Sequence, residues 1–508
     1  MFHHSESGES ILTSRRAMLK YAGGCGLMTN TSLLATLLNL QATKSAMAQT
    51  DTSGYKALVC LFFHGGNDAY NTLTPYDGDS TSGEYGDYYQ VRGGFDDGTN
   101  NPGGLALEQS TLVPISGPNS RTFGLHPGMA TQVGGPSGDP TDDGVAGLYK
   151  SGKLAFVTNV GSLVEPTSRA AYNTQANLPL GLFSHADLQR HWQTGVPQTR
   201  SQVTGWGGRM ADLMLSSNAN DTVSMNISIS GMNMFQTGGT VVPYAIGTGG
   251  ATLFGGYSHD LSTLNRQNRM GTRGFDSMLG QTYADLLAKS FAEASRNSVD
   301  AAIDFNAAVN AVNLNTEFAS GSPNAQLEMV ARCIGARQAL GQTRQIFFVS
   351  YGGWDMHTNL ISGHNYRLPM VSQAMKSFND AMVELGVDSD VTLFTASDFA
   401  RTLGTNGQGS DHGWGANHMV MGGAVDGGKM YGEYPSSLLN PTSDADPSLG
   451  NLNLGRGRLI PTTSVDEYAA ELAMWFGVGN NQDLEDMLPN IRNFYTTGGS
   501  TGPLDLFV

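Results

Sequence analysis

Two segments near the C-terminal end decide the fold: Val391-Thr-Leu-Phe-Thr-Ala-Ser-Asp398-Phe-Ala-Arg401-Thr402 and Asp411-His412-Gly-Trp-Gly-Ala-Asn-His418. The first begins as an apolar run, which is typical of a buried strand, and ends in polar residues. The second adds a carboxylate and two imidazoles. Divalent metals prefer such a mixture of oxygen and nitrogen ligands. The end of a strand is also where an open α/β sheet binds its ligands.

Two other segments repeat this pattern. His64-Gly-Gly-Asn-Asp68 follows the apolar run 57–63, and Gly352-Gly-Trp-Asp355-Met-His357 follows the apolar run 345–350. Strand ends at one edge of a parallel sheet lie close together. Three apolar strands that end in Asp or His therefore predict one assembled metal site.

Strands and helices alternate along most of the chain. We expect strands at 55–63, 154–159, 223–229, 345–350, 390–395 and 418–424, and helices at 184–193, 275–315, 325–340, about 366–385 and 463–476. This alternation predicts an α/β fold with a mainly parallel sheet flanked by helices. Residues 77–143 are rich in Gly, Asp, Ser and Asn and are expected to form an irregular insertion, in which Leu125-His-Pro-Gly-Met129 is a candidate helix start. We expect residues 49–508 to form a single domain.

The composition excludes some classes of function. The chain has 66 glycines among 508 residues, only 14% charged residues and a net charge of −16. Abundant glycine with sparse charge suits a loop-rich secreted protein. The basic surface that nucleic acids require is missing from such an acidic chain, so nucleic-acid binding is not expected.

The N-terminus resembles an export signal. Ser14-Arg15-Arg16-Ala-Met-Leu-Lys20 is a twin-arginine pattern, a weakly apolar stretch follows, and Ala46-Met47-Ala48 is a small-x-small cleavage site. We expect residues 1–48 to be a twin-arginine signal peptide and the mature protein to be periplasmic or extracellular. The alternative is a chance basic turn before an amphipathic helix. No transmembrane segment is expected after signal removal, and the sequence leaves the oligomeric state open.

Two cysteines remain after the expected cleavage, Cys60 and Cys333. Both lie among apolar residues, which favours buried, unreactive thiols. A disulfide between them is the alternative.

Six motifs give the chain a family resemblance. They are Phe63-His-Gly-Gly-Asn-Asp68, Phe183-Ser-His185, Thr204-Gly-Trp-Gly-Gly-Arg209, Gly352-Gly-Trp-Asp-Met-His-Thr-Asn359, Ser397-Asp-Phe-Ala-Arg-Thr402 and Asp411-His-Gly413. In this order they resemble the DUF1501 family, secreted bacterial proteins of largely unknown function. That family is in turn similar to the alkaline phosphatase superfamily, which includes sulfatases.

The resemblance implies an alkaline-phosphatase-like fold with a site for two divalent ions, zinc or manganese. Asp68, Asp411 and His412 would hold one ion, and Asp355, His357 and His418 the other. Ser184 would be the nucleophile, and Arg401 or Arg209 would bind the substrate oxygens. Two departures are visible: the superfamily spacing Asp-x-x-x-His is shortened to Asp355-x-His357, and neither cysteine carries the formylglycine motif of sulfatases.

Each of these residues also has a structural interpretation. Asp68 and Ser184 are suited to capping the helices that follow them. Asp355 and His357 suit a structural hydrogen-bonded pair, and His418 a buried core histidine. Asp398 is expected to support a ligand or to pair with Arg401, and His64 and His185 are expected to support ligands.

The predicted function is therefore an exported metal-dependent hydrolase of phosphate or sulfate esters, acting on a small molecule or a polymer. The alternative is a catalytically degenerate protein of the same fold that serves in binding or assembly at the cell surface.

Overall fold

Strand β1 (Lys56–Phe63) lies within a nine-stranded sheet, and its residues 57–63 are all buried. The computed structural model describes residues 53–130, 143–219, 223–253, 255–440, 452–499 and 501–508. The expected signal peptide, residues 1–48, lies outside the described residues. Residues 50–508 group into one compact unit.

The sheet has the order β13-β5-β12-β9-β1-β8-β6-β7, and β14 pairs with β5. The strands besides β1 are β5 (Leu154–Gly161), β6 (Asn226–Ser228), β7 (Tyr244–Ala245), β8 (Arg344–Tyr351), β9 (Val391–Ser397), β12 (Ala416–Gly422), β13 (Met430–Gly432) and β14 (Thr463–Ser464). Only β12 runs against its neighbours, β5 and β9. The mixed α/β fold with a mostly parallel central sheet is thus confirmed.

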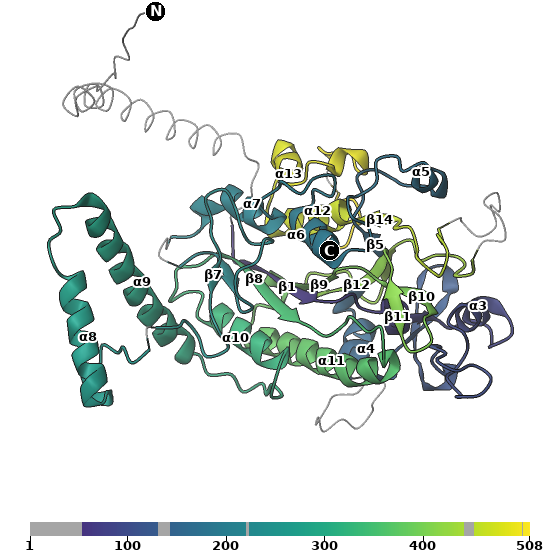
Figure 1. Cartoon of the computed structure of the whole chain (residues 1–508), viewed down its shortest axis with the longest axis horizontal. Coiled ribbons are helices and arrows are strands. Elements are labelled where there is room, and N and C mark those ends of the chain that lie inside the picture. Colours follow the sequence, from purple (N-terminus) through teal and green to yellow (C-terminus); the bar gives the residue numbers. More distant parts are fainter. Residues whose placement is uncertain (1–52, 131–142, 220–222, 254, 441–451, 500) are drawn as a thin grey trace, which may run out of the picture. The chain divides into compact units, whose positions relative to one another are not determined.

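Helices cover both faces of the sheet (Figure 1). Successive strand residues point to opposite faces, so Val59 of β1 packs with one layer and Leu58 with the other. The first layer contains α4 (Gly144–Lys150), α10 (Asn324–Gly335) and α11 (Leu360–Glu384). The second contains α6 (His185–Thr194), α7 (Trp206–Leu213), α12 (Val465–Phe476) and α13 (Gln482–Met487). Among the described residues, no helix is long and apolar enough to cross a membrane.

Two helix predictions are corrected. The expected helix 275–315 is two helices, α8 (Arg266–Leu279) and α9 (Leu286–Asn310), because α8 ends at Gly280 and Asp285 caps α9 through its side chain. Helix α11 begins at Leu360, earlier than predicted, and accommodates Pro369.

The region 77–143 is more ordered than predicted. It contains α3 (Gly83–Val91), β3 (Val113–Ser116) and β4 (Thr122–Leu125), and these strands join β2 (Leu73–Pro75) in a small antiparallel sheet. The helix predicted to start near Leu125 is only a short 3₁₀ turn, Pro127–Met129, and residues 131–142 lie outside the described residues. The remaining short elements are α2 (Ala69–Thr72), α5 (Arg169–Asn173), β10 (Arg401–Thr405) and β11 (Ser410–His412).

Both cysteines of the described chain are free and buried. Cys60 packs with the second helix layer and Cys333 with the first, so the sheet separates them. Burial raises the pKa of both thiols. The prediction of buried thiols is confirmed, and the disulfide alternative is wrong.

Four buried histidines predict an acid-sensitive fold. Burial lowers the pKa of His126, His364 and His418 to about 3 and that of His191 to about 4. An unfolded imidazole has a pKa of about 6.5, so below that pH the unfolded chain binds protons that the native chain excludes. The stability present above about pH 6.5 is therefore lost as the pH falls, by up to about 1.4 kcal/mol per pH unit for each histidine.

We expect the urea midpoint to fall markedly between about pH 7 and about pH 5. His418→Leu should reduce this dependence, since it removes one such group. His259→Gln is the matched control, because the side chain of His259 is 48% exposed. Identical pH dependence in the wild type and the His418 variant would contradict the argument.

Candidate metal centre

The centre lies where three neighbouring parallel strands end. Strand β1 pairs with β8 on one side and β9 on the other, and both pairs are parallel. Their carboxyl ends therefore lie at one edge of the sheet. The loops after β1 and β8 pack tightly there: Gly65 has φ +117°, and a Cβ on it would lie 2.4 Å from the backbone nitrogen of Asp355.

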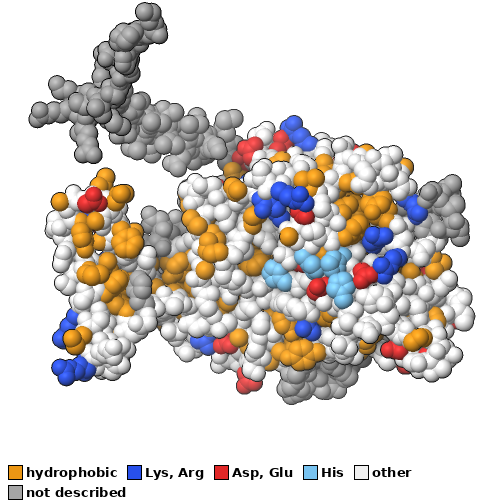
Figure 2. Space-filling model, in the orientation of Figure 1, with side chains coloured by type: hydrophobic (Ala, Val, Ile, Leu, Met, Phe, Trp, Pro, Cys, Tyr) orange, Lys and Arg blue, Asp and Glu red, His pale blue; other side chains and the backbone are white. Residues whose placement is uncertain are grey.

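Two further segments reach this edge. In the β10–β11 hairpin Arg401 is paired with His412, which carries Asp411 and His412 over the strand ends. Helix α6 begins at His185. Histidine side chains gather with carboxylates and basic side chains on this face of the surface (Figure 2).

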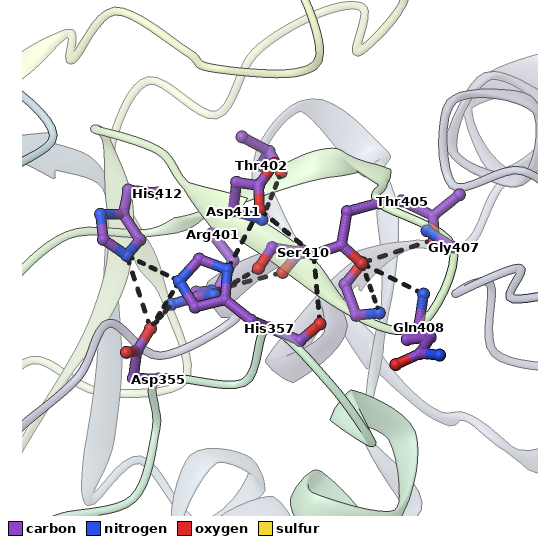
Figure 3. A network of polar contacts seen from close by, with 12 residues as sticks. Asp355, His357, Arg401, Thr402, Thr405, Gly407, Gln408, Ser410, Asp411 and His412 are labelled. Carbon is purple, nitrogen blue, oxygen red and sulfur yellow. Dashed lines mark hydrogen bonds and ion pairs between the residues drawn. The ribbon is translucent and has the colours of Figure 1, made fainter.

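Three imidazoles surround the carboxylate of Asp355 (Figure 3 shows two of them). His357 Nε2 lies 3.1 Å from Asp355 Oδ1 and 3.0 Å from His412 Nε2. His412 Nε2 lies 3.5 Å from the same carboxylate oxygen. His185 Nε2 lies 3.4 Å from Asp355 Oδ2. One ligand atom each from His185, Asp355 and His412 lies within 4.8 Å of the others.

The other ring nitrogen of each histidine faces an acceptor. Nδ1 of His357 lies 3.0 Å from Asp411 Oδ1, and Nδ1 of His412 lies 2.7 Å from the carbonyl oxygen of Phe183. Nδ1 of His185 lies 2.6 Å from Asp398 Oδ2, which also accepts from two other donors. Each Nδ1 therefore carries the proton in the neutral ring, and each Nε2 presents a lone pair.

This donor set fits a divalent cation. Three lone pairs and a carboxylate repel one another unless positive charge lies between them. Ligand atoms about 2.0–2.1 Å from one ion lie about 2.9 Å apart at right angles and about 3.4 Å apart at the tetrahedral angle, close to the separations above. Acceptors behind metal-binding histidines are the usual outer support of such sites.

The set fits one ion better than two. Within the part of the chain that the structure describes, His185, Asp355 and His412 form a group whose ligand atoms lie close enough together to share one ion. His357 joins them by its contacts with Asp355 and His412. The second ion implied by the superfamily therefore has no ligand group of its own among the described residues.

The local charges keep both carboxyl groups ionised. Partial burial opposes ionisation of Asp355, but Arg401 and the histidines outweigh it and lower the pKa of Asp355. The pKa of Asp411 is likewise lowered, because Asn406, Arg456 and His357 outweigh desolvation. The hydrogen bond to Asp398 raises the pKa of His185, whereas burial lowers that of His412. The side chains of Asp355 and His357 are 46% and 43% exposed, so small ligands can reach the centre.

Arg401 supports the centre from the protein interior. Its buried guanidinium donates to Asp355 Oδ1 at 2.6 Å, to the carbonyl of Gly65 at 3.2 Å and to both oxygens of Ser410. Its donors are thus directed to protein groups, which corrects the predicted role in binding substrate. Arg209, the other predicted candidate, donates to backbone carbonyls of Thr194, Thr204 and Met487 and lies outside the centre.

Three residues predicted to bind metal do not face the Asp355 cluster. Asp68 is fully buried in an ion pair with Arg92. His418 is buried between the rings of Trp192 and Tyr468, because its position in β12 points it into the second helix layer. Asp411 orients His357 and pairs with Arg456 instead of facing the other ligand atoms.

Among the described residues, the Ser184 hydroxyl bonds to Asp187 and makes no hydrogen bond to the cluster. Ser184 is the N-cap residue of α6, without a side-chain bond to the helix backbone, and its hydroxyl contributes to lowering the pKa of Asp187. Of the two roles predicted for Asp398, the structure shows the first: its carboxylate lies against Nδ1 of His185 and supports that ring.

Two groups of the centre do not stand out in the sequence. His185 is predicted only to support ligands, and no prediction includes the carbonyl of Phe183. The feature of the sequence that points to Phe183 and His185 is their position on either side of Ser184, at the expected start of a helix. Phe183 has φ 69°, a left-handed conformation that is strained for a bulky residue. Its carbonyl accepts from His412.

Asp411→Asn tests the outer support of the centre. The substitution removes the charge behind His357 and permits the wrong tautomer of that ring. We expect about 10- to 100-fold weaker binding of Zn²⁺, measured by chelator competition. Asp426→Asn is the matched control, since Asp426 pairs with Lys429 at the surface. Equal Zn²⁺ affinities in the two variants would show that Asp411 does not support the centre.

Comparison with known proteins gives a family match over most of the chain. The model of a family described as "Protein of unknown function (DUF1501)" matches residues 55–482. A search of curated proteins found no match. Among solved structures, Ps i-CgsB in complex with k-i-k-neocarrahexaose is 11% identical, with a TM-score of 0.29, and the alignment covers 87% of this chain and 77% of that one. Ps i-CgsB alone is 11% identical with a TM-score of 0.30, covering 86% and 77%. Similarity at this level carries no inference.

Proposed function

The chain belongs to the DUF1501 family, and we propose that it is an exported, metal-dependent hydrolase of phosphate or sulfate esters with an alkaline-phosphatase-like fold. The observation that carries the proposal is the convergence of three Nε2 lone pairs on the Asp355 carboxylate. The twin-arginine pattern before residue 49 supports export. The position of the ligands at the carboxyl ends of β1, β8 and β9 supports the fold assignment.

His185, His357, His412 and Asp355 would hold the cation, which we propose to be zinc or manganese. When bound, a divalent cation acts as a Lewis acid toward an ester oxygen and toward the attacking nucleophile. The protein's own part is orientation: Asp398, Asp411 and the carbonyl of Phe183 fix the three rings, and Arg401 fixes the carboxylate.

Basic groups beside the centre suit an anionic ester. Arg456 lies 2.6 Å from Asp411 Oδ2, and its side chain is 53% exposed. Arg458 stacks over the ring of Phe183 at 5.0 Å. A guanidinium group can donate two parallel hydrogen bonds to two oxygens of one phosphate or sulfate group. In a chain of net charge −16, this local positive charge would attract an anionic substrate.

Ser184 is the proposed nucleophile. Its chain neighbours on both sides, Phe183 and His185, touch the centre. In this scheme the Ser184 hydroxyl attacks phosphorus or sulfur, the bond to the leaving alcohol breaks, and water then releases the inorganic anion.

The second candidate function is a non-enzymatic binding or assembly protein of the same fold. It is favoured by one observation: the Ser184 hydroxyl bonds to Asp187 instead of facing the cluster. Such a protein would bind the cation without turnover.

An ester assay separates the two functions. Purified protein is stripped with a chelator, reloaded with Zn²⁺ or Mn²⁺ and assayed with aryl phosphates and aryl sulfates. We expect turnover that returns with metal and is lost in Ser184→Ala. Ser201→Ala, in an exposed loop, is the matched control. Unchanged turnover in Ser184→Ala would assign the attack to water, and stoichiometric metal without turnover would favour the binding protein.

A further inference from the structure

Helices α8 and α9 form an arm, Arg266–Asn310, that exposes an unusual amount of apolar surface. Thirteen large hydrophobic side chains are exposed among the described residues, and five of them lie in this arm: Met270, Met278, Leu286, Leu287 and Phe291, which are 56–80% exposed. Hydrophobic side chains extend along the arm in Figure 2. Solvent-exposed apolar groups so concentrated mark an interaction surface.

This apolar surface is not the contact between the two helices. Arg296 of α9 lies 2.8 Å from Asp276 of α8, and Tyr257 donates to the same carboxylate at 2.9 Å. Thr272 and Ala292 are buried on the inner side. Leu287 and Phe291 of α9 are four residues apart and so lie side by side on the outer surface of that helix, and Met270 and Met278 add exposed apolar surface on α8.

The charges of the arm are self-complementary. Helix α8 carries three exposed arginines, Arg266, Arg269 and Arg273, and one aspartate. Helix α9 with its N-cap carries four carboxylates, those of Asp285, Glu293, Asp300 and Asp304, and two basic residues. The helices thus have opposite net charges of equal size. None of the three arginines has a carboxylate partner among the described residues.

We propose that the arm is a homodimerisation surface, on which α8 of one copy packs against α9 of the partner across a two-fold axis. A two-fold interface uses the same patch twice, so it must be complementary to itself. Two hairpins joined in this way form a four-helix bundle with the exposed apolar side chains inside. An anionic lipid surface would attract α8 but repel α9 and the acidic chain as a whole. This inference does not depend on the proposed function.

Sedimentation of the full protein at micromolar concentration tests the apolar part. We expect a dimer for the wild type and a monomer for Leu287→Asp/Phe291→Asp, with unchanged circular dichroism because both side chains are exposed. Val203→Asp/Met232→Asp, at positions 71% and 65% exposed outside the arm, should stay dimeric. A monomeric wild type, or a dimer that survives the arm substitutions, would overturn the proposal.

A charge exchange tests the pairing. The double substitution Arg269→Glu/Arg273→Glu reverses the sign of the net charge of α8. The double substitution Glu293→Arg/Asp304→Arg does the same for α9. For each variant alone, the dissociation constant of the dimer should rise at least about tenfold. An equimolar mixture of the two variants should form a mixed dimer. Failure of the mixture to associate would contradict the α8–α9 pairing. Binding of monomers to anionic vesicles in place of self-association would make the arm a lipid-binding surface and overturn the proposal.

Discussion

His412→Ala is expected to abolish stoichiometric metal binding and to reduce ester hydrolysis more than about 100-fold, beyond the loss that an outer-support change causes. The substitution removes one of the three Nε2 groups that face Asp355. It also leaves the carbonyl of Phe183 without the donor it now has in His412. Elemental analysis of dialysed protein and turnover of an aryl phosphate measure the two effects.

The control for this variant is His259→Ala. His259 is a half-exposed histidine that lies 3.7 Å from Asp300, in a different part of the chain. It should keep full metal content and activity. If His412→Ala retains one ion per chain with wild-type affinity, the cation is not held as described.

Arg92→Met is expected to destabilise the protein by about 3–5 kcal/mol, because it leaves the carboxylate of Asp68 buried without its partner. Both side chains are fully buried. Arg92 also donates to the carbonyls of Thr402 and Leu403 and so ties β10, the strand that carries Arg401, to this ion pair. Urea unfolding at neutral pH measures the loss.

The double variant Asp68→Leu/Arg92→Met isolates the cause. Removing both charges abolishes the unpaired carboxylate, so the double variant should be more stable than Arg92→Met alone. If the single and double variants unfold at the same urea concentration, the ion pair is not the source of the destabilisation.

The parts of the site that the sequence predicts well are those next to strand ends. Asp355 and His357 follow β8, and its parallel pairing with β1 fixes the edge at which they emerge. The apolar run of β9 identifies the third strand of that edge, which His412 reaches as predicted, although it meets Asp355 there and not Asp68. In each case a local pattern and a general rule of parallel sheets suffice.

The residues that the sequence misplaces depend on long-range partners. Asp68 follows β1 as predicted, but it meets Arg92, which comes from the region expected to be irregular. His418 is diverted by strand parity, since one residue of register decides which face of β12 it joins. His185 joins the cluster through the packing of α6 against β9, and its place beside Ser184 at a helix start is the only local feature that points to it.

Anomalous X-ray diffraction from crystals of the metal-loaded protein, recorded at the absorption edge of the bound ion, would show whether these three histidines and Asp355 hold one cation. We expect one strong peak about 2.0–2.2 Å from Nε2 of His185, His357 and His412 and from a carboxylate oxygen of Asp355. A peak bound by Asp68 or His418, or ligation through the Nδ1 atoms, would contradict this assignment.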